Sequence, residues 1–293
     1  MEGGGEGRGP EDGLDKPGSG PAWRNFYGRR RGKPLRPAQR RYLEEILPRL
    51  RVPGLAVDPD LFPGLAAPVK AGPDDASFGK TMAERGAADA DHAAAAGRMT
   101  AATPETIDLA ALFPDAREIW LEIGFGGGEH LHHLALAHPE VGLIGCEPFV
   151  NGVAMLLGRI AREDPGNIRI HPGDARDLID HLPEASLGRV YLLYPDPWPK
   201  ARHHKRRLAG AETLTSLARR MVPEAELRLA TDIADYADHA VEGAAATGLL
   251  EPVKITASDR SRPWPGWSST RYEAKALREG RRPNYLIWRR TPG

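Results

Sequence analysis

From about residue 118 onward, two hydrophobic patterns alternate along the chain. Short apolar runs rich in branched residues are separated by longer stretches in which apolar residues recur with helical spacing. The predicted strands are 119–123, 141–146, 168–170, 190–193 and 227–230, and the predicted helices lie near 128–138, 151–163, 210–221 and 233–246. Strands that alternate with helices predict βαβ units and a mostly parallel sheet.

The last part of the chain departs from this alternation. Two further β-rich pieces, 249–255 and 284–289, are joined by a loop of Arg, Ser, Pro and Trp instead of a helix. We expect these pieces to form a hairpin-like antiparallel pair at one edge of the sheet. The pattern therefore predicts one α/β domain, residues 104–293, with a mostly parallel seven-stranded sheet and an antiparallel C-terminal edge pair.

The N-terminal third has a different texture. Residues 1–21 consist mainly of Gly, Glu, Asp and Pro, so we predict a disordered tail. Residues 22–51 begin with a basic, aromatic arm and continue into one amphipathic helix from Pro37 to Leu50. The cations of this arm could contact RNA, or the arm could be a flexible segment that binds nothing. Residues 52–103 are rich in Pro, Gly and Ala and show no sustained periodicity, so we predict an insert or linker.

Composition narrows the class of protein only slightly. In 293 residues, 40 Lys and Arg balance 40 Asp and Glu, so only local charge clusters can indicate a partner. The single cysteine, Cys146, excludes a disulfide framework and a thiolate cluster for zinc or iron–sulfur. No apolar run approaches the ~20 residues that span a bilayer, and the N-terminus lacks a signal-peptide pattern. We therefore expect a cytoplasmic protein without a membrane partner.

A glycine loop follows the first predicted strand. Gly124 and Gly126 permit a tight turn and let a ligand approach the backbone closely. In the dinucleotide fingerprint a glycine would stand where this chain has Glu129, and a carboxylate there would repel a pyrophosphate at the helix N-terminus. S-adenosylmethionine has no phosphate, and its ammonium and sulfonium tolerate nearby acids such as Glu122. The loop therefore favours S-adenosylmethionine over a nicotinamide cofactor, although a plain tight turn remains an alternative.

Acids stand at the ends of three successive predicted strands. Glu122 ends the first strand, Glu147 the second, and Asp174 follows the third. Glu147 is placed to accept hydrogen bonds from ribose hydroxyls, in a nicotinamide site as well as in an S-adenosylmethionine site. Asp174 could accept from an adenine amino group, or could instead cap the following helix. Together the three acids outline one nucleoside site.

The fourth predicted strand runs into a proline-rich turn with one acid. Three prolines in Tyr194–Lys200 restrict the backbone and fix the direction of Asp196, at the sheet edge where ligands bind in open α/β folds. A run of cations then follows without an intervening acid: Lys200, Arg202, Lys205, Arg206 and Arg207. Such a run suits RNA phosphates, and the alternative is an ordinary solvated charge run.

Several motifs occur in order along the chain: Glu122-Ile123-Gly124-Phe125-Gly126, Tyr194-Pro195-Asp196-Pro197-Trp198-Pro199-Lys200, Arg202-His203 with Lys205-Arg206-Arg207, Thr231-Asp232 and Thr270-Arg271-Tyr272-Glu273. Together they resemble the bacterial tRNA (guanine-N7-)-methyltransferases, over residues 118–290 and more loosely over 25–50. The resemblance implies a Rossmann-like class I methyltransferase fold and S-adenosylmethionine as the methyl donor. It also implies that the acceptor is N7 of a guanine in the tRNA variable loop.

The resemblance assigns roles by position. Cofactor contacts are expected from Glu122, Gly124, Gly126, Glu147, Asp174 and Asp196; substrate contacts from Lys200, Asp232, Thr270, Arg271, Tyr272 and Glu273; and RNA contacts from Arg202, Lys205, Arg206 and Arg207. Guanine N7 already carries a lone pair, so no proton has to be removed before it attacks a methyl group. We therefore expect Asp196 to act by positioning and electrostatic stabilisation, and only weakly as a base.

Other features leave alternatives open. Four histidines between residues 130 and 138 have no convincing carboxylate or thiolate set around them, so no metal site is predicted. Trp264 and Trp267 could stack on bases or pack a loop over the core. Two other functions compete: a nicotinamide-dependent oxidoreductase, disfavoured by Glu129, and a non-enzymatic RNA-binding protein, disfavoured by the four acids. The number of subunits is left open.

Overall fold

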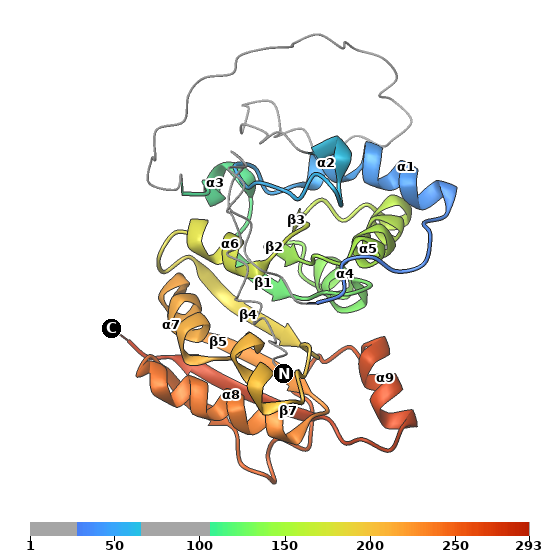
Figure 1. Cartoon of the computed structure of the whole chain (residues 1–293). Helices are drawn as coiled ribbons and strands as arrows, with labels where there is room; N and C mark the ends of the chain where they lie inside the picture. The colour runs from blue at the N-terminus through green and yellow to red at the C-terminus, as the bar shows by residue number, and fades with distance from the viewer. Residues whose placement is uncertain (1–27, 66–105, 293) are drawn as a thin grey trace, which may run out of the picture.

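A seven-stranded sheet forms the centre of the computed structural model, which describes residues 28–65 and 106–292 (Figure 1). The strands are β1 (Glu118–Ile123), β2 (Val141–Cys146), β3 (Ile168–His171), β4 (Leu187–Leu193), β5 (Met221–Thr231), β6 (Leu250–Lys254) and β7 (Asn284–Arg290). Their order is β3-β2-β1-β4-β5-β7-β6, and β7 alone runs in the direction opposite to the other six strands. The predicted α/β fold with an antiparallel C-terminal edge pair is confirmed.

The strand order fixes where a ligand can bind. The chain winds outward from β1 through β2 to β3, then returns to place β4 on the other side of β1. The point between β1 and β4, where the winding reverses, is the usual ligand position in such sheets, at the carboxyl ends of the strands. We call the edge at which β1 to β5 end the carboxyl edge.

Helices cover both faces of the sheet. One face carries α4 (Glu129–Ala137) and α5 (Val150–Glu163), with α1 (Pro37–Glu45) and α2 (Leu47–Leu50) beside α5, as Figure 1 shows. The other carries α6 (Ala175–His181), α7 (Ala211–Arg220) and α8 (Ala234–Thr247). The remaining elements are α3 (Leu109–Leu112), α9 (Arg271–Arg278) and the 3-10 helices η1 (Pro63–Leu65) and η4 (Ala201–Arg206). Neither α6 nor α9 was predicted, because seven or eight residues give too few turns for a clear period.

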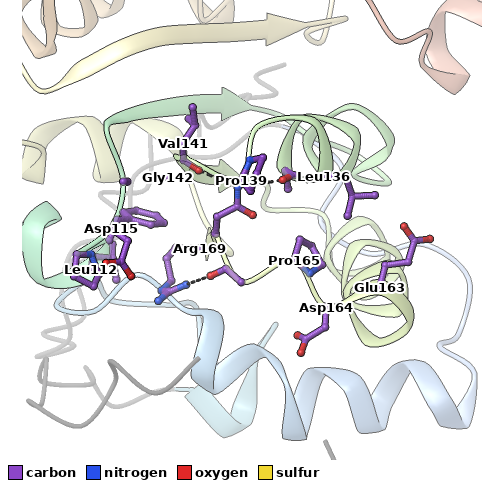
Figure 2. Close-up of a pocket in the computed structure, with 16 residues that line it drawn as sticks. Leu112, Asp115, Leu136, Pro139, Val141, Gly142, Glu163, Asp164, Pro165 and Arg169 are labelled. Carbon is purple, nitrogen blue, oxygen red and sulfur yellow. Dashed lines mark hydrogen bonds between the residues drawn. The ribbon is translucent and has the colours of Figure 1, made fainter. Parts of the chain in front are cut away.

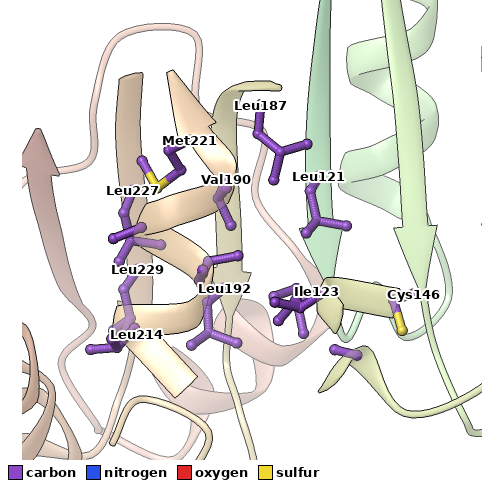
Figure 3. Close-up of a cluster of buried hydrophobic side chains, with 14 of the residues drawn as sticks. Leu121, Ile123, Cys146, Leu187, Val190, Leu192, Leu214, Met221, Leu227 and Leu229 are labelled. Atoms are coloured by element: carbon purple, nitrogen blue, oxygen red, sulfur yellow. The ribbon is translucent and has the colours of Figure 1, made fainter. Parts of the chain in front are cut away.

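Strands β1 to β3 and the second half of β4 are buried on both faces, which explains their continuous apolar runs. Figure 3 shows one cluster of buried side chains from these elements, which includes Leu121 of β1, Val190 and Leu192 of β4, Leu227 of β5 and Leu214 of α7. All five side chains are at most 2 % exposed. Each such side chain contributes roughly 1.5–3 kcal/mol by leaving water, so the core holds the strand ends of the carboxyl edge in fixed positions.

The predicted amphipathic helix is broken into two. Helix α1 ends at Glu45, and α2 starts at Leu47 with Pro48 in its first turn. Proline has no backbone N–H and its ring clashes with the carbonyl four residues earlier, so a continuous helix through this position is disfavoured. The apolar spacing is kept across the break, since Ile46, Leu47 and Leu50 are all buried against the α5 face.

The stretch 52–65, predicted as part of an insert or linker, packs against the sheet. Five of its apolar side chains are at most 5 % exposed: Val52, Leu55, Val57, Phe62 and Leu65. The buried Arg51 guanidinium donates to the Leu55 and Leu65 carbonyls at 2.7 Å each. The packing of this stretch on β3 and the α5 face joins residues far apart in the sequence, so local periodicity carried no signal of it. The predictions for residues 1–21 and 66–103, and for Trp23, Phe26 and Tyr27 of the arm, lie outside the described residues.

Candidate active site

The loops that carry the predicted site residues leave the sheet together at the carboxyl edge. The Gly124 N–H donates to the Cys146 carbonyl at 2.8 Å, the Glu147 N–H to the His171 carbonyl at 3.1 Å, and the Tyr194 N–H to the Ala230 carbonyl at 2.7 Å. Each loop is therefore joined to the end of a neighbouring strand. The parallel strands bring the residues that follow β1, β2, β4 and β5 to one edge, as the sequence predicted.

The glycine loop has the backbone conformation that requires glycine. Gly124 and Gly126 have φ angles of +73° and +56°, in the left-handed region that other residues rarely adopt. A Cβ atom on Gly126 would lie 2.8 Å from Cε2 of Tyr272, so the start of α9 lies directly over the loop. The Gly126 N–H donates to Glu147 Oε2 at 2.7 Å, which fixes the loop to the end of β2.

Glu147 is the most perturbed acid of the site. It is 7 % exposed, and its second oxygen accepts from the Phe149 N–H at 2.9 Å. Burial raises the pKa of Glu147 to about 7; the two backbone donors oppose this shift, and the nearby Asp196 carboxylate adds to it. The two acids therefore lie close enough to interact, and Glu147 changes its charge near neutral pH.

Asp196 lies in a strained turn. Tyr194 and Trp198, on either side of it, have φ angles of +50° and +41° although neither is glycine. Such angles are costly for aromatic residues and concentrate at functional sites. Asp196 itself is exposed, and partial burial raises the pKa of its carboxyl group while the Arg29 guanidinium lowers it. The turn thus holds one accessible carboxylate in a fixed direction.

The basic arm reaches this site through α5. Asn151 accepts from the Gly32 N–H at 2.7 Å and donates to the Lys33 carbonyl at 2.8 Å, while the Val150 N–H donates to the Arg30 carbonyl at 3.0 Å. These bonds bring Arg29 into electrostatic contact with Asp196. The sequence predicted a basic arm but not its position. The hydrogen bond between Gly32 and Asn151, which fixes that position, joins residues 119 apart in the sequence.

Two predicted cofactor contacts, Glu122 and Asp174, form hydrogen bonds with other residues of the chain. Glu122 is 2 % exposed, and its Oε2 atom lies 2.7 Å from Nδ1 of His130. Asp174 caps α6 by accepting from the Arg176 N–H at 2.9 Å, and also pairs with the Arg176 guanidinium at 2.5 Å. The helix-cap alternative for Asp174 is therefore what the structure shows. Neither carboxylate stands unpaired in the site as the sequence had suggested.

The segment that starts α9 has two different sides. Thr270 caps the helix by accepting from the Glu273 N–H at 3.2 Å, and Glu273 is 4 % exposed and accepts from Trp267 Nε1 at 3.0 Å and from the Tyr285 hydroxyl. Both side chains are thus buried and hydrogen-bonded within the chain, which the sequence-based assignment of substrate contacts did not anticipate. Their Thr-x-x-Glu spacing is itself the signature of a helix N-terminus.

The other two residues of this segment face the glycine loop. Tyr272 is 42 % exposed and packs on Gly126, and Arg271 donates to Met155 Sδ at 3.2 Å. The Arg271 charge also lowers the pKa of Glu147, so its guanidinium lies near the cofactor side of the site. The structure therefore brings Arg271 and Tyr272 to the predicted site.

The basic run that starts at Lys200 also contains both buried and exposed side chains. The Arg207 side chain is fully buried; its Nε atom donates to the Pro197 carbonyl at 2.9 Å, and its guanidinium pairs with Asp235. The Arg207 side chain thus holds the proline turn from within, instead of standing on the surface with the other predicted RNA contacts. The Arg206 guanidinium packs 5.0 Å from the Trp198 ring centre, which supports the same turn. Exposed cations remain at three predicted positions: Lys200, Arg202 and Lys205.

Asp232 and Tyr194 lie on the substrate side of the edge. Asp232 follows β5, its side chain is 14 % exposed, and it forms an ion pair with Arg281. Burial, with smaller contributions from the Glu273 and Asp232 charges, raises the pKa of the Tyr194 hydroxyl. Tyr194 and Arg281 were not singled out from the sequence, because nothing in their local pattern marks them.

The other features weighed from the sequence do not add residues to this site. A hollow of about 420 Å³, shown in Figure 2, lies near the amino ends of the strands, where Val141, Asp115 and Arg169 line it, and it contains no predicted site residue. Trp264 is 3 % exposed and packs 4.9 Å from the Trp267 ring, so it covers the core.

Among residues 28–65 and 106–292, no cluster of His, Cys, Asp and Glu could hold a metal, and no helix is long and apolar enough to cross a membrane.

Comparison with known proteins agrees with this arrangement. A family described as "Putative methyltransferase" matches residues 116–285, from just before β1 to the start of β7. The chain is 46 % identical over 273 residues to the tRNA (guanine-N(7)-)-methyltransferase of Cereibacter sphaeroides, covering 92 % of this chain and 93 % of that protein. The corresponding protein of Paracoccus denitrificans is 45 % identical over 272 residues, covering 92 % and 96 %.

Similarity to solved structures is more distant. The 16S rRNA methyltransferase KamB is 16 % identical, with a TM-score of 0.45 over 64 % of this chain and 95 % of that one. The family match and the sequence relatives are the decisive findings, since they extend over the glycine loop, the proline turn and the start of α9. The chain belongs to the tRNA (guanine-N7-)-methyltransferase family.

Proposed function

We propose that this chain transfers the methyl group of S-adenosylmethionine to N7 of a guanine in the variable loop of tRNA. The observation that carries the proposal is the position of Asp196, held by a strained turn between buried Glu147 and the exposed cations that begin at Lys200. The names of the close relatives support the same reaction.

The residues around the glycine loop fit the cofactor. Gly124 has open space where a side chain would stand, and Glu147 and Asp196 provide acceptors and negative charge suited to hydroxyl groups and to a cationic donor. When bound, S-adenosylmethionine supplies an electrophilic methyl group on a sulfonium. The Glu129 carboxylate pairs with Arg159 at 3.0 Å, so its charge is partly neutralised and excludes a pyrophosphate less strongly than the sequence suggested. Family membership now supports the choice of cofactor more than Glu129 does.

The work of Asp196 follows from the chemistry of guanine. N7 has an in-plane lone pair, so alignment matters more than proton removal, and the base becomes cationic as the methyl group is transferred. An ionised Asp196 would accept hydrogen bonds from the guanine and stabilise that developing charge. The Arg207 bond to the Pro197 carbonyl and the Trp198–Arg206 stack keep the turn in place for this role.

The exposed cations suit the RNA around the guanine. Lys200, Arg202 and Lys205 project from the loop next to Asp196, and Arg29 lies on its other side. Such side chains neutralise phosphates without reading sequence, so the proposed recognition depends on the shape of tRNA. The exposed Tyr272 over the glycine loop is placed to contact the base itself.

Methyl transfer to defined transcripts tests the proposal. Incubation of an unmodified tRNA transcript with S-adenosylmethionine labelled in its methyl group should place the label in the RNA. Replacing the variable-loop guanine by adenine should abolish labelling, whereas replacing a guanine in another loop should not. Equal labelling of all three transcripts, or saturable binding of NAD without binding of S-adenosylmethionine, would contradict the proposal.

A further inference from the structure

A buried histidine is paired with the carboxylate at the end of β1. His130, in the first turn of α4, is 1 % exposed, and its Nδ1 atom lies 2.7 Å from Oε2 of the equally buried Glu122. We assign the proton of this contact to Nδ1, so that the imidazole donates to the Glu122 carboxylate. The other ring nitrogen, Nε2, is buried without a hydrogen-bond partner among the described residues. The histidine is therefore committed to a single polar contact, with Glu122.

Aromatic rings fix the orientation of this imidazole. The Tyr191 ring of β4 lies 4.8 Å from the His130 ring centre, and the Trp267 ring lies 5.3 Å from it. Trp267 belongs to the loop before α9, and its Nε1 atom donates to Glu273 at 3.0 Å. A continuous set of contacts therefore runs from Glu122 through His130 and Trp267 to the first turn of α9.

Both ends of this set belong to the candidate site. Glu122 stands two residues before Gly124, the first glycine of the loop, and the first turn of α9 covers that loop. A Cβ atom on Gly126 would lie 2.8 Å from the Tyr272 ring, and one on Gly127 would lie 2.9 Å from Cζ of Arg271. The His130 contacts thus join a predicted cofactor residue to the segment that faces the substrate.

We propose that His130 is a positioning residue for methyl transfer: its Nδ1 proton fixes the direction of the Glu122 carboxylate, and its contact with Trp267 ties Glu122 to the Thr270–Glu273 segment. The proposal rests on the proposed function, and on the contact of Glu122 with S-adenosylmethionine that the family resemblance implies. A buried carboxylate without a donor would rotate or take up a proton, and either change would weaken its hold on a cationic ligand. In metal sites, removal of a partner that orients a ligand in this way changes affinity by about 10–100-fold, and we expect an effect of similar size here.

The variants H130N and H130Q separate positioning from packing. The Asn amide nitrogen can take the place of Nδ1, whereas the longer Gln side chain places its nitrogen near Nε2. Calorimetry with S-adenosylmethionine should show a Kd for H130N within about threefold of the wild type, and a Kd for H130Q raised by on the order of 10–100-fold. Thermal unfolding of both variants shows whether they fold. Equal affinities of the two folded variants would overturn the proposal, as would a failure of Asn to restore affinity relative to Gln.

Two further variants test the ends of the contact set. E122Q should weaken S-adenosylmethionine binding at least as much as H130Q, and unchanged binding would overturn the proposal even if the wild type methylates tRNA. W267F keeps an aromatic ring against His130 but removes the donor to Glu273, so it should raise the KM for tRNA more than the Kd for S-adenosylmethionine. An unchanged KM for tRNA would show that the link to α9 is wrong. A wild type that binds S-adenosylmethionine but methylates no tRNA would instead refute the proposed function.

Discussion

The carboxyl edge of the sheet has two sides that differ in character. On the side of β1 to β3, which we call the cofactor side, the acids are buried and bonded within the chain: Glu122 to His130, Glu147 to two backbone N–H groups, and Asp174 to its own helix. On the side of β4, β5 and α9, the substrate side, exposed cations and Tyr272 face solvent. The cofactor side is preorganised for a small ligand, whereas the substrate side is an open surface for a large anionic one.

Asp196 stands where the two sides meet. It is close enough to Glu147 to affect the pKa of that acid, and the loop that carries it continues into the exposed cations. The comparison therefore predicts that changes on the two sides affect different measurements. Changes on the cofactor side should alter cofactor binding and catalysis, and changes on the substrate side should alter tRNA affinity and its salt dependence.

The largest effect on catalysis is expected from changes to Asp196, where the two sides meet. D196A should lower kcat by on the order of 10²–10³-fold, because the developing positive charge on guanine loses its stabilising carboxylate. D196N, which keeps the shape without the charge, should lose most of the same activity. The tRNA affinity of both variants, measured by filter binding, should stay within about twofold of the wild type. A fall in tRNA affinity as large as the fall in kcat would erase the distinction between the two sides.

The second-largest effect is a pH dependence of the free energy of unfolding, caused by Glu147 on the cofactor side. The pKa of Glu147 is about 7 in the folded protein, above its ordinary value of 4.5. A raised carboxyl pKa stabilises the fold fully below about pH 4.5, and this stabilisation is lost as the pH rises through 7. Relative to E147Q, the wild type should therefore lose on the order of 3 kcal/mol of unfolding free energy between pH 4 and 8. Urea unfolding without cofactor measures this, and a difference that is constant with pH would contradict the assignment.

A smaller effect separates Arg207 from its neighbours in the basic run. R207A leaves the Pro197 carbonyl without its donor, so we expect a loss of about 1–3 kcal/mol of unfolding free energy. K205A changes an exposed side chain of the same loop and should leave stability within about 0.5 kcal/mol. Denaturant unfolding of the two single variants compares them directly. Equal stability of R207A and the wild type would show that Arg207 does not brace the turn.

The matching change on the substrate side should alter RNA binding without altering the fold. The double variant R202A/K205A should bind tRNA more weakly and should reduce the slope of log K against log salt by about 1–2, because up to two phosphate contacts are lost. R207A should leave that slope unchanged. If R207A reduced the slope and R202A/K205A did not, the division of the basic run would be reversed.

The sequence predicted the strands and the site edge well, for a physical reason. Strands buried on both faces are continuous apolar runs, so β1 to β5 were visible directly, and parallel strands necessarily bring residues such as Glu147 and Asp196 to one edge. The proline turn was found because its residues limit the backbone locally. The β6–β7 edge pair was predicted on other grounds, from two β-rich pieces joined by a loop without a helix, and β6 itself is largely exposed.

What the sequence could not predict depends on long-range contacts. Arg207 and Lys205 belong to one basic run, and only the fold shows that Arg207 points inward to Asp235 while Lys205 stays exposed. The Glu122–His130 pair and the position of Arg29 beside Asp196 likewise join elements that have no common local pattern. Residues 52–65 were misjudged for the same reason, since their order comes from packing on β3 and α5.

Nucleoside analysis of the reaction product tests the central claim most directly. Unmodified tRNA, incubated with the wild-type protein and S-adenosylmethionine, is digested to nucleosides and separated by chromatography with mass detection, alongside the same reaction with D196A. The account predicts 7-methylguanosine as the new nucleoside with the wild type and almost none with D196A. A methyl group on another guanine atom or another base, or equal amounts of 7-methylguanosine with D196A, would contradict it.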